Sequence, residues 1–562
     1  MRLSSALLAA GLVLADSATA VQKISRAGRY LFGADGNRFY IKGLSYQQQG
    51  LITSSDPTAF PEPSDYIDPL ADSAGCARDL PYMKQLGINT IRVYSVNSSA
   101  NHDSCMSALS GAGIYTIIDL SLPVNGSINR ASPQWGTNLL NLYIETIEAF
   151  SKYDNVLAYN VGNEVSNDIN STVAAPFVKA AARDVKAYLK SQNLPQLVGY
   201  AAVDAPDTWR FPLAEYLSCG SDAQSIDIYG LNNYEWCGAS SFQSAYTGTE
   251  NAFTNYNIPA YFSEFGCVSS PPRLWTEVQS LFGTDMTSEW SGGIAFSYFP
   301  AYGGFGMVNI SSDAKSVTTS DDFTRLVTQY SNVSFIESPS ETSAGTTSFP
   351  SCAAATSNFL ASNSLPPTPN ANTCNCVAQS FSCLFTPQTP NYTDIIGELL
   401  DYGCSQLGAD GSNCDLISSN GQTGTYGALS GCDPTIQLSY VMSSLYEATN
   451  RDPVTCNFSG NATQNPSAPP TKASAEAAAQ SCLNASPAST FTPSSVPIPG
   501  TSSATNSGST GSGTPTSTHN SGAGTWRRLG LGFTHGGSGW EGVVALMMVT
   551  VGAMGSGIWL VL

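Results

Sequence analysis

The chain has 562 residues, 14 cysteines and a formal net charge of −19, with only 23 Lys and Arg residues. This length exceeds what one hydrophobic core usually organises, so we expect two or more folded units. The sparse basic residues argue against nucleic acid as a partner, because phosphate binding needs clustered Lys and Arg.

The first 20 residues are typical of a secretory signal peptide. Arg2 precedes an apolar run from Ala6 to Ala15, and small residues follow at 18–20. We therefore expect cleavage before Val21 and a secreted chain. Secretion agrees with the cysteine content, because disulfides persist outside the cytosol.

Asn-x-Ser/Thr sequons are numerous, and such acceptors have meaning only in a secreted protein. The nine sequons begin at Asn97, Asn125, Asn170, Asn309, Asn332, Asn391, Asn457, Asn461 and Asn484.

The small number of histidines limits the kinds of catalytic and metal site that the chain can form. His519 and His535 lie in the C-terminal tail, and His102 stands in what we interpret as a surface loop. Metal sites built on several histidines and Ser-His-Asp hydrolysis are therefore disfavoured. A phosphate-cradling Walker motif is also missing from the sequence. We expect no cofactor and no metal, which leaves carboxylate chemistry.

Residues 21–335 alternate short apolar runs with helical patterns, as in a parallel sheet covered on both faces. The predicted strands are 38–46, 90–96, 115–121, 156–164, 197–202, 226–234, 260–266 and 292–299. Eight such strands with intervening helices predict an α/β fold, a (β/α)8 (TIM) barrel. A doubly wound open sheet is the alternative.

Two of the intervening helices have a clear apolar face. Residues 138–152 place Leu139, Leu142, Tyr143, Thr146, Ile147 and Phe150 together. Residues 173–191 predict Phe177, Ala181 and Val185 inward, with Lys179, Arg183 and Lys186 outward.

A linker rich in Ser, Thr and Pro is expected over 336–373, and a small cysteine-rich module over 374–482. The module contains Cys374, Cys376, Cys383, Cys404, Cys414, Cys432, Cys456 and Cys482. Eight cysteines predict four disulfides, and the sequence leaves all 105 possible pairings open. A zinc site is the weaker alternative, because the close pair Cys374 and Cys376 has poor spacing and no histidine accompanies it.

From about Ala462 to Thr525 the composition predicts a disordered, O-glycosylated stalk, and we assign 483–540 to this stalk and a polar spacer. An apolar segment, 541–562, ends the chain. Small residues and a polar spacer before such a segment are typical of a glycosylphosphatidylinositol (GPI) attachment signal. A C-terminal membrane helix is the alternative.

Two glutamates stand at the ends of predicted strands. Glu164 ends the fourth strand and Glu264 ends the seventh. In a (β/α)8 barrel both strand ends face one mouth. Two carboxylates there can cleave a glycosidic bond, one as proton donor and one as nucleophile. For either residue alone, a salt bridge or a helix N-terminal charge is the structural alternative.

Four motifs carry a resemblance to a known family. The segments "FYIKGLSYQQQ", "YNVGNEVSN", "IDIYGLNNYEWCG" and "PAYFSEFGC" together resemble the fungal β-1,3-glucanosyltransferases of glycoside hydrolase family seventy-two. The resemblance covers roughly residues 22–335. The cysteine-dense segment 374–482 resembles the family forty-three carbohydrate-binding module that accompanies one branch of these enzymes.

The resemblance implies roles for individual residues. Glu164 matches the acid/base, Glu264 matches the nucleophile, and Asn163 would hold the sugar next to the cleaved bond. Further sugar contacts are implied for Gln47, Tyr94, Asp119, Tyr234 and Tyr298. The implied disulfides of the catalytic domain are Cys76–Cys105, Cys219–Cys352 and Cys237–Cys267.

One segment departs from the family pattern. After the last predicted strand the chain reads "SYFPAYGGFG", with Pro300 and Ala301 where family members carry polar or acidic groups. Acceptor binding is therefore the feature that the resemblance supports least.

The function implied by the resemblance is internal cleavage of β-1,3-glucan and transfer of the new reducing end to a second β-1,3-glucan chain. A hydrolytic endo-β-1,3-glucanase and a non-catalytic glucan-binding wall protein are the alternatives. The expected partners are donor and acceptor glucan chains and, through the GPI anchor, the outer face of the plasma membrane. A monomer is expected.

Overall fold

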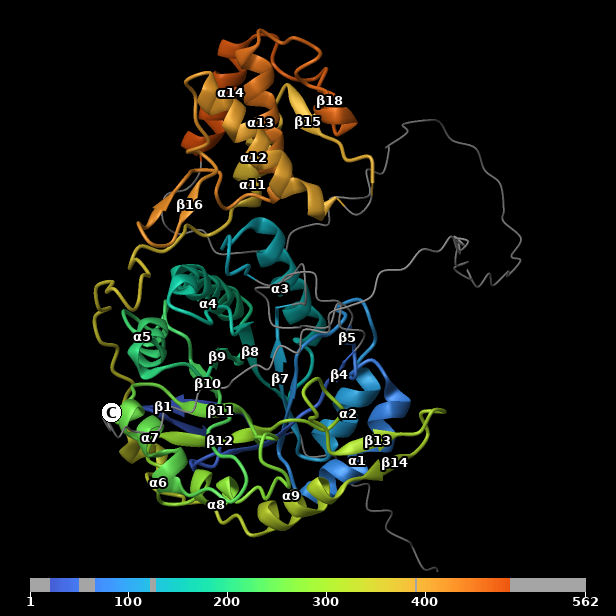
Figure 1. Cartoon of the computed structure of the whole chain (residues 1–562), viewed down its shortest axis with the longest axis vertical. Coiled ribbons are helices and arrows are strands. Elements are labelled where there is room, and N and C mark those ends of the chain that lie inside the picture. Colours follow the sequence, from blue (N-terminus) through green and yellow to red (C-terminus); the bar gives the residue numbers. More distant parts are fainter. Residues whose placement is uncertain (1–20, 50–65, 122–127, 390–391, 486–562) are drawn as a thin grey trace, which may run out of the picture. The chain divides into compact units, whose positions relative to one another are not determined.

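The computed structural model describes residues 21–49, 66–121, 128–389 and 392–485 (Figure 1). The expected signal peptide, most of the stalk and the anchor signal lie outside these residues, as do the sequons at Asn125 and Asn391. Of the other sequons, Asn97, Asn170, Asn309, Asn332, Asn457 and Asn484 are exposed, and Asn461 is half-buried.

Eight parallel strands close into one barrel. In spatial order they are β3 (Ile41–Ser45), β6 (Thr90–Val93), β7 (Tyr115–Asp119), β8 (Val156–Asn163), β9 (Leu197–Val203), β10 (Ile228–Asn232), β11 (Ala260–Phe265) and β12 (Trp290–Ala295). Because β12 pairs with β3, the sheet has no edge. The (β/α)8 prediction is confirmed, and the open sheet is excluded.

Helices cover the outside of the barrel between successive strands (Figure 1). They are α1 (Ser73–Leu86), α2 (Asp103–Gly111), α3 (Thr137–Phe150), α4 (Ala175–Ser191), α5 (Asp207–Ser218), α6 (Phe242–Ala245), α7 (Thr247–Phe253), α8 (Glu277–Leu281) and α9 (Asp321–Ser331). The short 3-10 turn η1 (Asn170–Ala174) precedes α4. Asp72 caps α1 by accepting from the Gly75 amide, and Ser320 caps α9 in the same way through Phe323.

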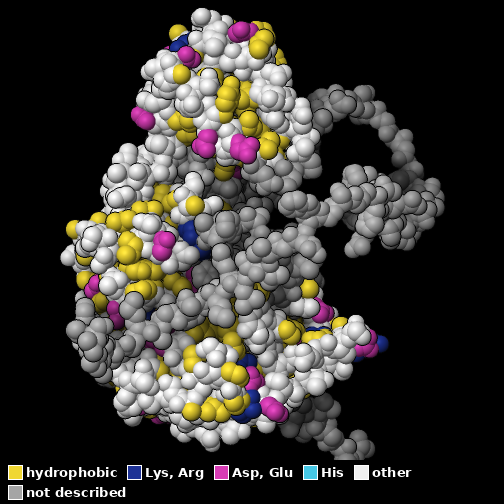
Figure 2. Space-filling model, viewed as in Figure 1, with side chains coloured by type: hydrophobic (Ala, Val, Ile, Leu, Met, Phe, Trp, Pro, Cys, Tyr) yellow, Lys and Arg dark blue, Asp and Glu magenta, His cyan; other side chains and the backbone are white. Residues whose placement is uncertain are grey.

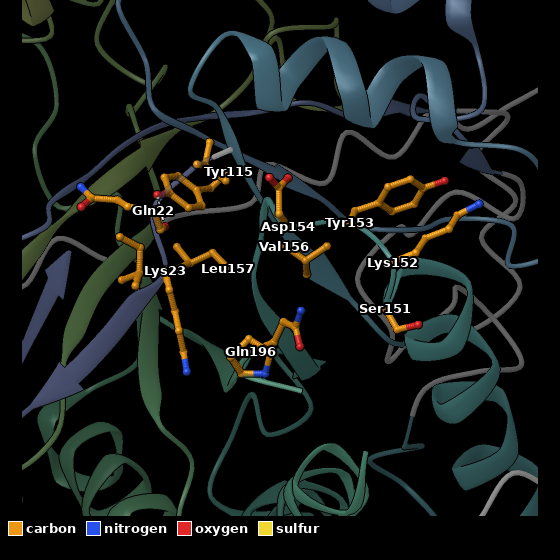
Figure 3. A pocket seen from close by; sticks show the side chains of 13 residues that line it. Gln22, Lys23, Tyr115, Ser151, Lys152, Tyr153, Asp154, Val156, Leu157 and Gln196 are labelled. Atoms are coloured by element: carbon orange, nitrogen blue, oxygen red, sulfur yellow. Dashed lines mark hydrogen bonds between the residues drawn. The ribbon is translucent and has the colours of Figure 1, made fainter. Parts of the chain in front are cut away.

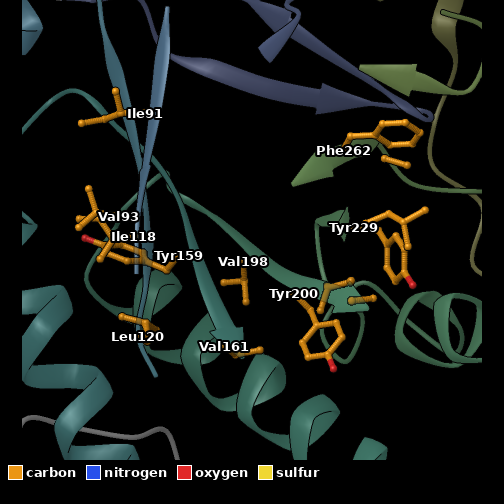
Figure 4. Close-up of a cluster of buried hydrophobic side chains, with 14 of the residues drawn as sticks. Ile91, Val93, Ile118, Leu120, Tyr159, Val161, Val198, Tyr200, Tyr229 and Phe262 are labelled. Atoms are coloured by element: carbon orange, nitrogen blue, oxygen red, sulfur yellow. The ribbon is translucent and has the colours of Figure 1, made fainter. Parts of the chain in front are cut away.

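The largest core cluster lies between the strands and these helices. It combines outward-facing strand residues, such as Ile91, Ile118 and Tyr159, with helix residues such as Ile147 and Phe177 (Figure 4). Strand side chains alternate between the two faces of the barrel wall. Every second residue of a strand is therefore available to the barrel interior.

A hairpin closes the N-terminal end of the barrel. β1 (Ile24–Ala27) and β2 (Tyr30–Gly33) pair antiparallel, and Ile24 and Leu31 join the cluster inside the barrel. That cluster includes Ile41, Ile117 and Ile294 from three barrel strands. Mainly apolar side chains therefore fill the lower part of the barrel.

Two predictions about single residues are wrong. Lys179 was expected outward but is only 1% exposed, because its ammonium group donates to the carbonyls of Tyr216 and Cys219. His102 was expected on the surface but is 2% exposed, with Nε2 within 2.8 Å of Asp68. In both cases a distant segment supplies the polar partner that makes burial tolerable.

Two short strand pairs and one short helix lie outside the barrel sheet. They are the antiparallel pairs β4 (Gln48–Gln49) with β5 (Tyr66–Ile67) and β13 (Val308–Ile310) with β14 (Val317–Thr319), and the short helix α10 (Glu341–Ala344). Disulfides Cys76–Cys105, Cys219–Cys352 and Cys237–Cys267 are present in this part of the chain.

The cysteine-rich module is mainly helical. Its helices are α11 (Ala371–Ala378), α12 (Thr393–Ala409), α13 (Pro434–Ala448) and α14 (Lys472–Ala485), with the 3-10 turn η2 (Phe458–Gly460). Its strand pairs are β15 (Cys383–Phe385) with β18 (Ala462–Gln464), and β16 (Ser419–Asn420) with β17 (Thr425–Tyr426). Because β18 and α14 are ordered, the stalk prediction is wrong for residues 462–485.

Four disulfides hold the module together: Cys374–Cys432, Cys376–Cys482, Cys383–Cys456 and Cys404–Cys414. All its cysteines are thus paired, which excludes the zinc alternative. The bond from Cys376 to Cys482 joins α11 to α14 across 106 residues. Covalent links of this kind compensate for the small core of such a module.

The apolar face of α3 provides a test of the fold. We predict that Ile147→Ala, at a fully buried position, lowers the free energy of unfolding by about 2–5 kcal/mol, since it leaves a cavity against the barrel wall. Glu145→Ala, on the exposed face of the same helix, should change it by less than about 0.5 kcal/mol. Urea denaturation measures both, and equal effects would contradict the assigned helix orientation.

Candidate active site

The end of β8 contains one residue more than its neighbour β9. Asn160 pairs with Gly199 and Asn163 pairs with Ala201, so three steps along β8 match two along β9. Bulges of this kind re-aim side chains near functional sites. As a result Asn160 and Asn163, which a regular strand would point to opposite faces, both form hydrogen bonds inside the barrel.

β11 has a similar irregularity at its end. Leu231 pairs with Phe262, but the next residue, Asn232, pairs with Glu264. The neighbours Ser263 and Glu264 therefore both reach the interior, where Ser263 donates to Asn232 at 2.7 Å. The bulge brings the Glu264 carboxyl over the mouth of the barrel.

A buried arginine, Arg92 of β6, joins the polar groups at the mouth. Its guanidinium forms two bonds with Asp119, at 2.7 and 3.2 Å, and one with Glu264 at 3.1 Å. It also donates to the amide oxygens of Asn163 at 2.8 Å and Asn232 at 3.3 Å. Arg92 is fully buried, so these partners replace its hydration.

Glu264 is held by three donors. Arg92 and the Tyr94 hydroxyl, at 2.9 Å, bind Oε1, and the Tyr234 hydroxyl binds Oε2 at 2.7 Å. Burial raises the pKa of Glu264 above its ordinary value, while Arg92 and the two phenols act in the opposite direction. These contacts favour the ionised form, which a nucleophile requires.

Glu164 has a different environment. Its carboxyl accepts one hydrogen bond, from Asn232 to Oε1 at 2.7 Å, and the described residues supply no donor to Oε2. Burial and, next, the charge of Glu264 raise the pKa of Glu164 to about 7. Glu164 therefore retains its proton in mildly acidic and near-neutral solution, as a general acid must.

One amide network connects the two carboxyl groups. Asn232 donates to Glu164 and accepts from Arg92, which in turn donates to Glu264. Glu164 and Glu264 thus belong to one site, and Glu264 acts electrostatically on Glu164. Asn163 lies beside them with Oδ1 occupied by Arg92 and Asn232, and within the described residues its Nδ2 has no acceptor.

Tyr94 and Tyr234 line the same site through their bonds to Glu264. The observed hydrogen bonds of Gln47, Asp119 and Tyr298 are with other groups of the protein. Gln47 accepts from the amides of Tyr94 and Ser95, at 3.0 and 3.1 Å, and so fixes the chain after β6.

Asp119 accepts hydrogen bonds from the Arg92 guanidinium and, at 2.6 Å, from the side-chain amide of Asn160. Tyr298 is fully buried and donates to Asp79 at 3.0 Å. A direct sugar contact by Gln47, Asp119 or Tyr298 stays a prediction, and their observed contacts are with protein groups.

The segment with Pro300 and Ala301 forms a turn beside the site. Ala301 bridges to Phe305, whose ring packs 5.5 Å from that of Tyr234. Because Phe305 packs on Tyr234 and Tyr234 binds Glu264, two side chains separate Ala301 from the predicted nucleophile.

A cavity of about 280 Å³ lies away from the carboxyl pair (Figure 3). Its walls include Tyr115 and Leu157, at the starts of β7 and β8, together with Gln22 and Lys23 before β1. None of the predicted site residues lines it.

Metal-binding clusters and membrane-spanning helices are both absent from the described part of the chain. No group of three or more His, Cys, Asp or Glu side chains there has an arrangement that could hold a metal ion. Within the same residues, no helix is both long and apolar enough to cross a bilayer. On the face drawn in Figure 2, acidic and basic side chains are scattered among uncharged atoms.

Arg92 and Asn232 were missed by the sequence analysis. A charged residue inside the predicted strand 90–96 is unusual, and that signal could have identified Arg92. Asn232 lies in a quoted motif, but only the folded barrel shows that its amide joins Glu164 to Arg92.

Electrostatic coupling between the carboxyl groups is directly testable. We predict that Glu264→Gln lowers the pKa of Glu164 from about 7, because it removes the nearby negative charge. Carbon-13 NMR of labelled glutamate would measure the change. Glu250→Gln, which removes a carboxyl with a raised pKa beside Glu289, is the control and should leave Glu164 unchanged. An unaltered pKa in Glu264→Gln would show that the carboxyl groups are not coupled.

Comparison with known proteins identifies two regions of the chain. Residues 13–334 match the glycoside hydrolase family 72, described as glucanosyltransferase. Residues 381–463 match the X8 domain. The first match spans the barrel, and the second lies within the disulfide-rich module.

Similar proteins cover most of the chain. The 1,3-beta-glucanosyltransferase gas1 of Schizosaccharomyces pombe is 40% identical over 461 residues, covering 81% of each chain. The 1,3-beta-glucanosyltransferase GAS2 of Saccharomyces cerevisiae is 38% identical over 437 residues, covering 75% of this chain and 76% of that protein.

A solved structure of Saccharomyces cerevisiae Gas2p in complex with laminaripentaose is also similar. It has 36% sequence identity and a TM-score of 0.70, with 80% of this chain and 99% of that chain covered. The family match spans more than half of the chain and both named relatives exceed 30% identity, so the chain belongs to the glycoside hydrolase family 72 glucanosyltransferases.

Proposed function

We propose that this chain is a retaining β-1,3-glucanosyltransferase with Glu164 as acid/base and Glu264 as nucleophile. The supporting observation is that Arg92 and Asn232 connect two carboxyl groups in contrasting environments at one barrel mouth. Retaining enzymes place such groups about 5–5.5 Å apart, close enough for double displacement.

In the first step, a Glu264 oxygen attacks the anomeric carbon of a β-1,3-linked glucosyl unit. Glu164 donates its proton to the departing glycosidic oxygen, and a glycosyl ester forms on Glu264. The Asn163 Nδ2, which has no acceptor among the described residues, can donate to the 2-hydroxyl of the reacting sugar, a contact that strengthens in the transition state.

In the second step, a hydroxyl of another glucan chain attacks the ester. Glu164, now a carboxylate, accepts the hydroxyl proton, and Glu264 is released as a carboxylate. Water in place of the acceptor would give hydrolysis. Transfer requires the acceptor hydroxyl to be held at a high effective concentration. The turn containing Ala301 and Phe305 packs against Tyr234 and is a candidate part of the acceptor site.

We further propose the domain arrangement and location implied by the sequence. A cleaved leader precedes the barrel, the disulfide-rich module binds β-1,3-glucan, and the stalk and GPI anchor hold a monomer at the outer face of the plasma membrane and the cell wall. Metabolic labelling of the anchor and phospholipase release from intact cells would test the last point.

The carboxyl pair is tested by activity. We predict that Glu164→Gln and Glu264→Gln each lower the transfer rate by a factor of thousands, since each removes about 4 kcal/mol or more of transition-state stabilisation. The substrate is a reduced laminari-oligosaccharide of defined length. Glu277→Gln, a change at another buried glutamate, should retain activity.

Products longer than the substrate would support transfer. Only shorter products would identify an endo-β-1,3-glucanase. Activity retained in both site variants would contradict the assigned carboxyl roles, and a wild-type protein that binds glucan without altering it would be a non-catalytic wall protein.

The phenol donors to Glu264 provide a pH test. We predict that Tyr234→Phe raises the pKa of Glu264, because the lost hydrogen bond favoured the carboxylate. At low pH Glu264 is protonated and inactive, which produces the acid limb of the pH profile of kcat/KM. This limb should then move to higher pH. Tyr298→Phe, whose hydroxyl binds Asp79, should leave that limb in place. Equal shifts in both variants would contradict a specific role of Tyr234.

A further inference from the structure

The backbone of Glu164 has an unusual conformation. Its φ angle is +49°, in the left-handed region that costs a non-glycine residue about 1–2 kcal/mol. Two contacts hold it there. The Glu164 amide donates to the carbonyl of Ala201 on β9 at 2.8 Å, and its own carbonyl accepts from Arg130 Nη2 at 3.0 Å.

Arg130 comes from the connection between β7 and α3. It forms no ion pair with a described carboxylate, and its Nη1 is buried without a hydrogen-bond partner among the described residues. Arg130 is half-buried, and water screens a partly buried guanidinium less than an exposed one, so its charge acts on nearby ionisable groups. Its nearest functional neighbour is the residue whose carbonyl it binds.

We propose that Arg130 is a positioning residue for Glu164, fixing the backbone of the acid/base and presenting a permanent positive charge to its carboxyl. This inference rests on the proposed role of Glu164. Among the described residues, Arg130 forms its hydrogen bond with the peptide carbonyl of Glu164, so it acts through that residue and not on the sugar.

The groups around Glu164 act in two directions. Burial and Glu264 of β11 raise its pKa, whereas the hydrogen bond from Asn232 and the charges of Arg92 and Arg130 lower it. Tyr200 of β9 and Tyr234 are further titratable neighbours, and their phenols, whose pKa values are raised by burial, stay neutral.

These opposing influences suit a group that must first give and then take a proton. While Glu264 is ionised, its charge helps Glu164 to keep the proton. Once Glu264 is esterified, that charge is gone, and the positive charges of Arg92 and Arg130 favour the Glu164 carboxylate needed for the second step.

The test compares Arg130→Met, Arg130→Lys and the control Arg451→Met by pH profiles of transfer. Arg451 also donates to backbone carbonyls, those of Pro469 and Pro470, but in the C-terminal module. For Arg130→Met we expect kcat to fall about 10-fold to 100-fold. The alkaline limb of kcat/KM should move to higher pH, because without the positive charge Glu164 holds its proton more strongly.

Arg130→Lys keeps the charge but loses the planar fork. Its kcat should fall while its alkaline limb stays near that of the wild type, and Arg451→Met should change neither quantity. A uniform loss of rate in Arg130→Met with an unmoved limb would overturn the proposal. If Arg130→Met does not fold, an alkaline limb of kcat/KM that moves to higher pH in Arg130→Lys would also overturn the proposal.

These outcomes are separable from failure of the proposed function. If Glu164→Gln retained transfer activity, the assigned role of Glu164 would be wrong whatever the Arg130 variants did. If Glu164→Gln were inactive and the limb of Arg130→Met did not move, only the role of Arg130 would be wrong.

Discussion

One buried cation organises the mouth of this barrel. The Arg92 guanidinium, withdrawn from solvent, is neutralised by Asp119 on the neighbouring strand and by Glu264 across the barrel. Removing the guanidinium would leave two carboxylates in a poorly solvated place, which is far more costly than losing an exposed ion pair. The same guanidinium orients the amides of Asn163 and Asn232. Stability and chemistry therefore depend on the same contacts.

Around that cation, two identical side chains acquire different properties. Glu264 receives a charged donor and two phenols, whereas Glu164 is half-buried, with one amide donor and a like charge nearby. Carboxyl groups whose surroundings push their pKa values apart can divide the work of acid and nucleophile. The strand-end bulges make this possible, because they bring side chains of both strand faces to one mouth.

Much of this architecture was predictable from local patterns. Continuous apolar runs and helical spacing identified all eight barrel strands and the apolar faces of α3 and α4, and strand ends identified Glu164 and Glu264. Burial of Lys179 and His102 was not predictable, because their partners, Tyr216, Cys219 and Asp68, are distant in sequence. The bulges depend on register between strands, which composition does not encode. Composition likewise suggested a stalk where β18 pairs with β15 and a disulfide to Cys482 secures α14.

The β1–β2 hairpin has a geometric consequence for a polymeric substrate. Because Ile24 and Leu31 plug the lower end of the barrel, a long polysaccharide cannot thread through it and must approach from above. Such a polysaccharide chain would lie across the rim of the barrel, with both of its ends free to extend beyond the protein. Access of this kind imposes no requirement for a chain terminus, so a bond far from either end of the polymer can be reached.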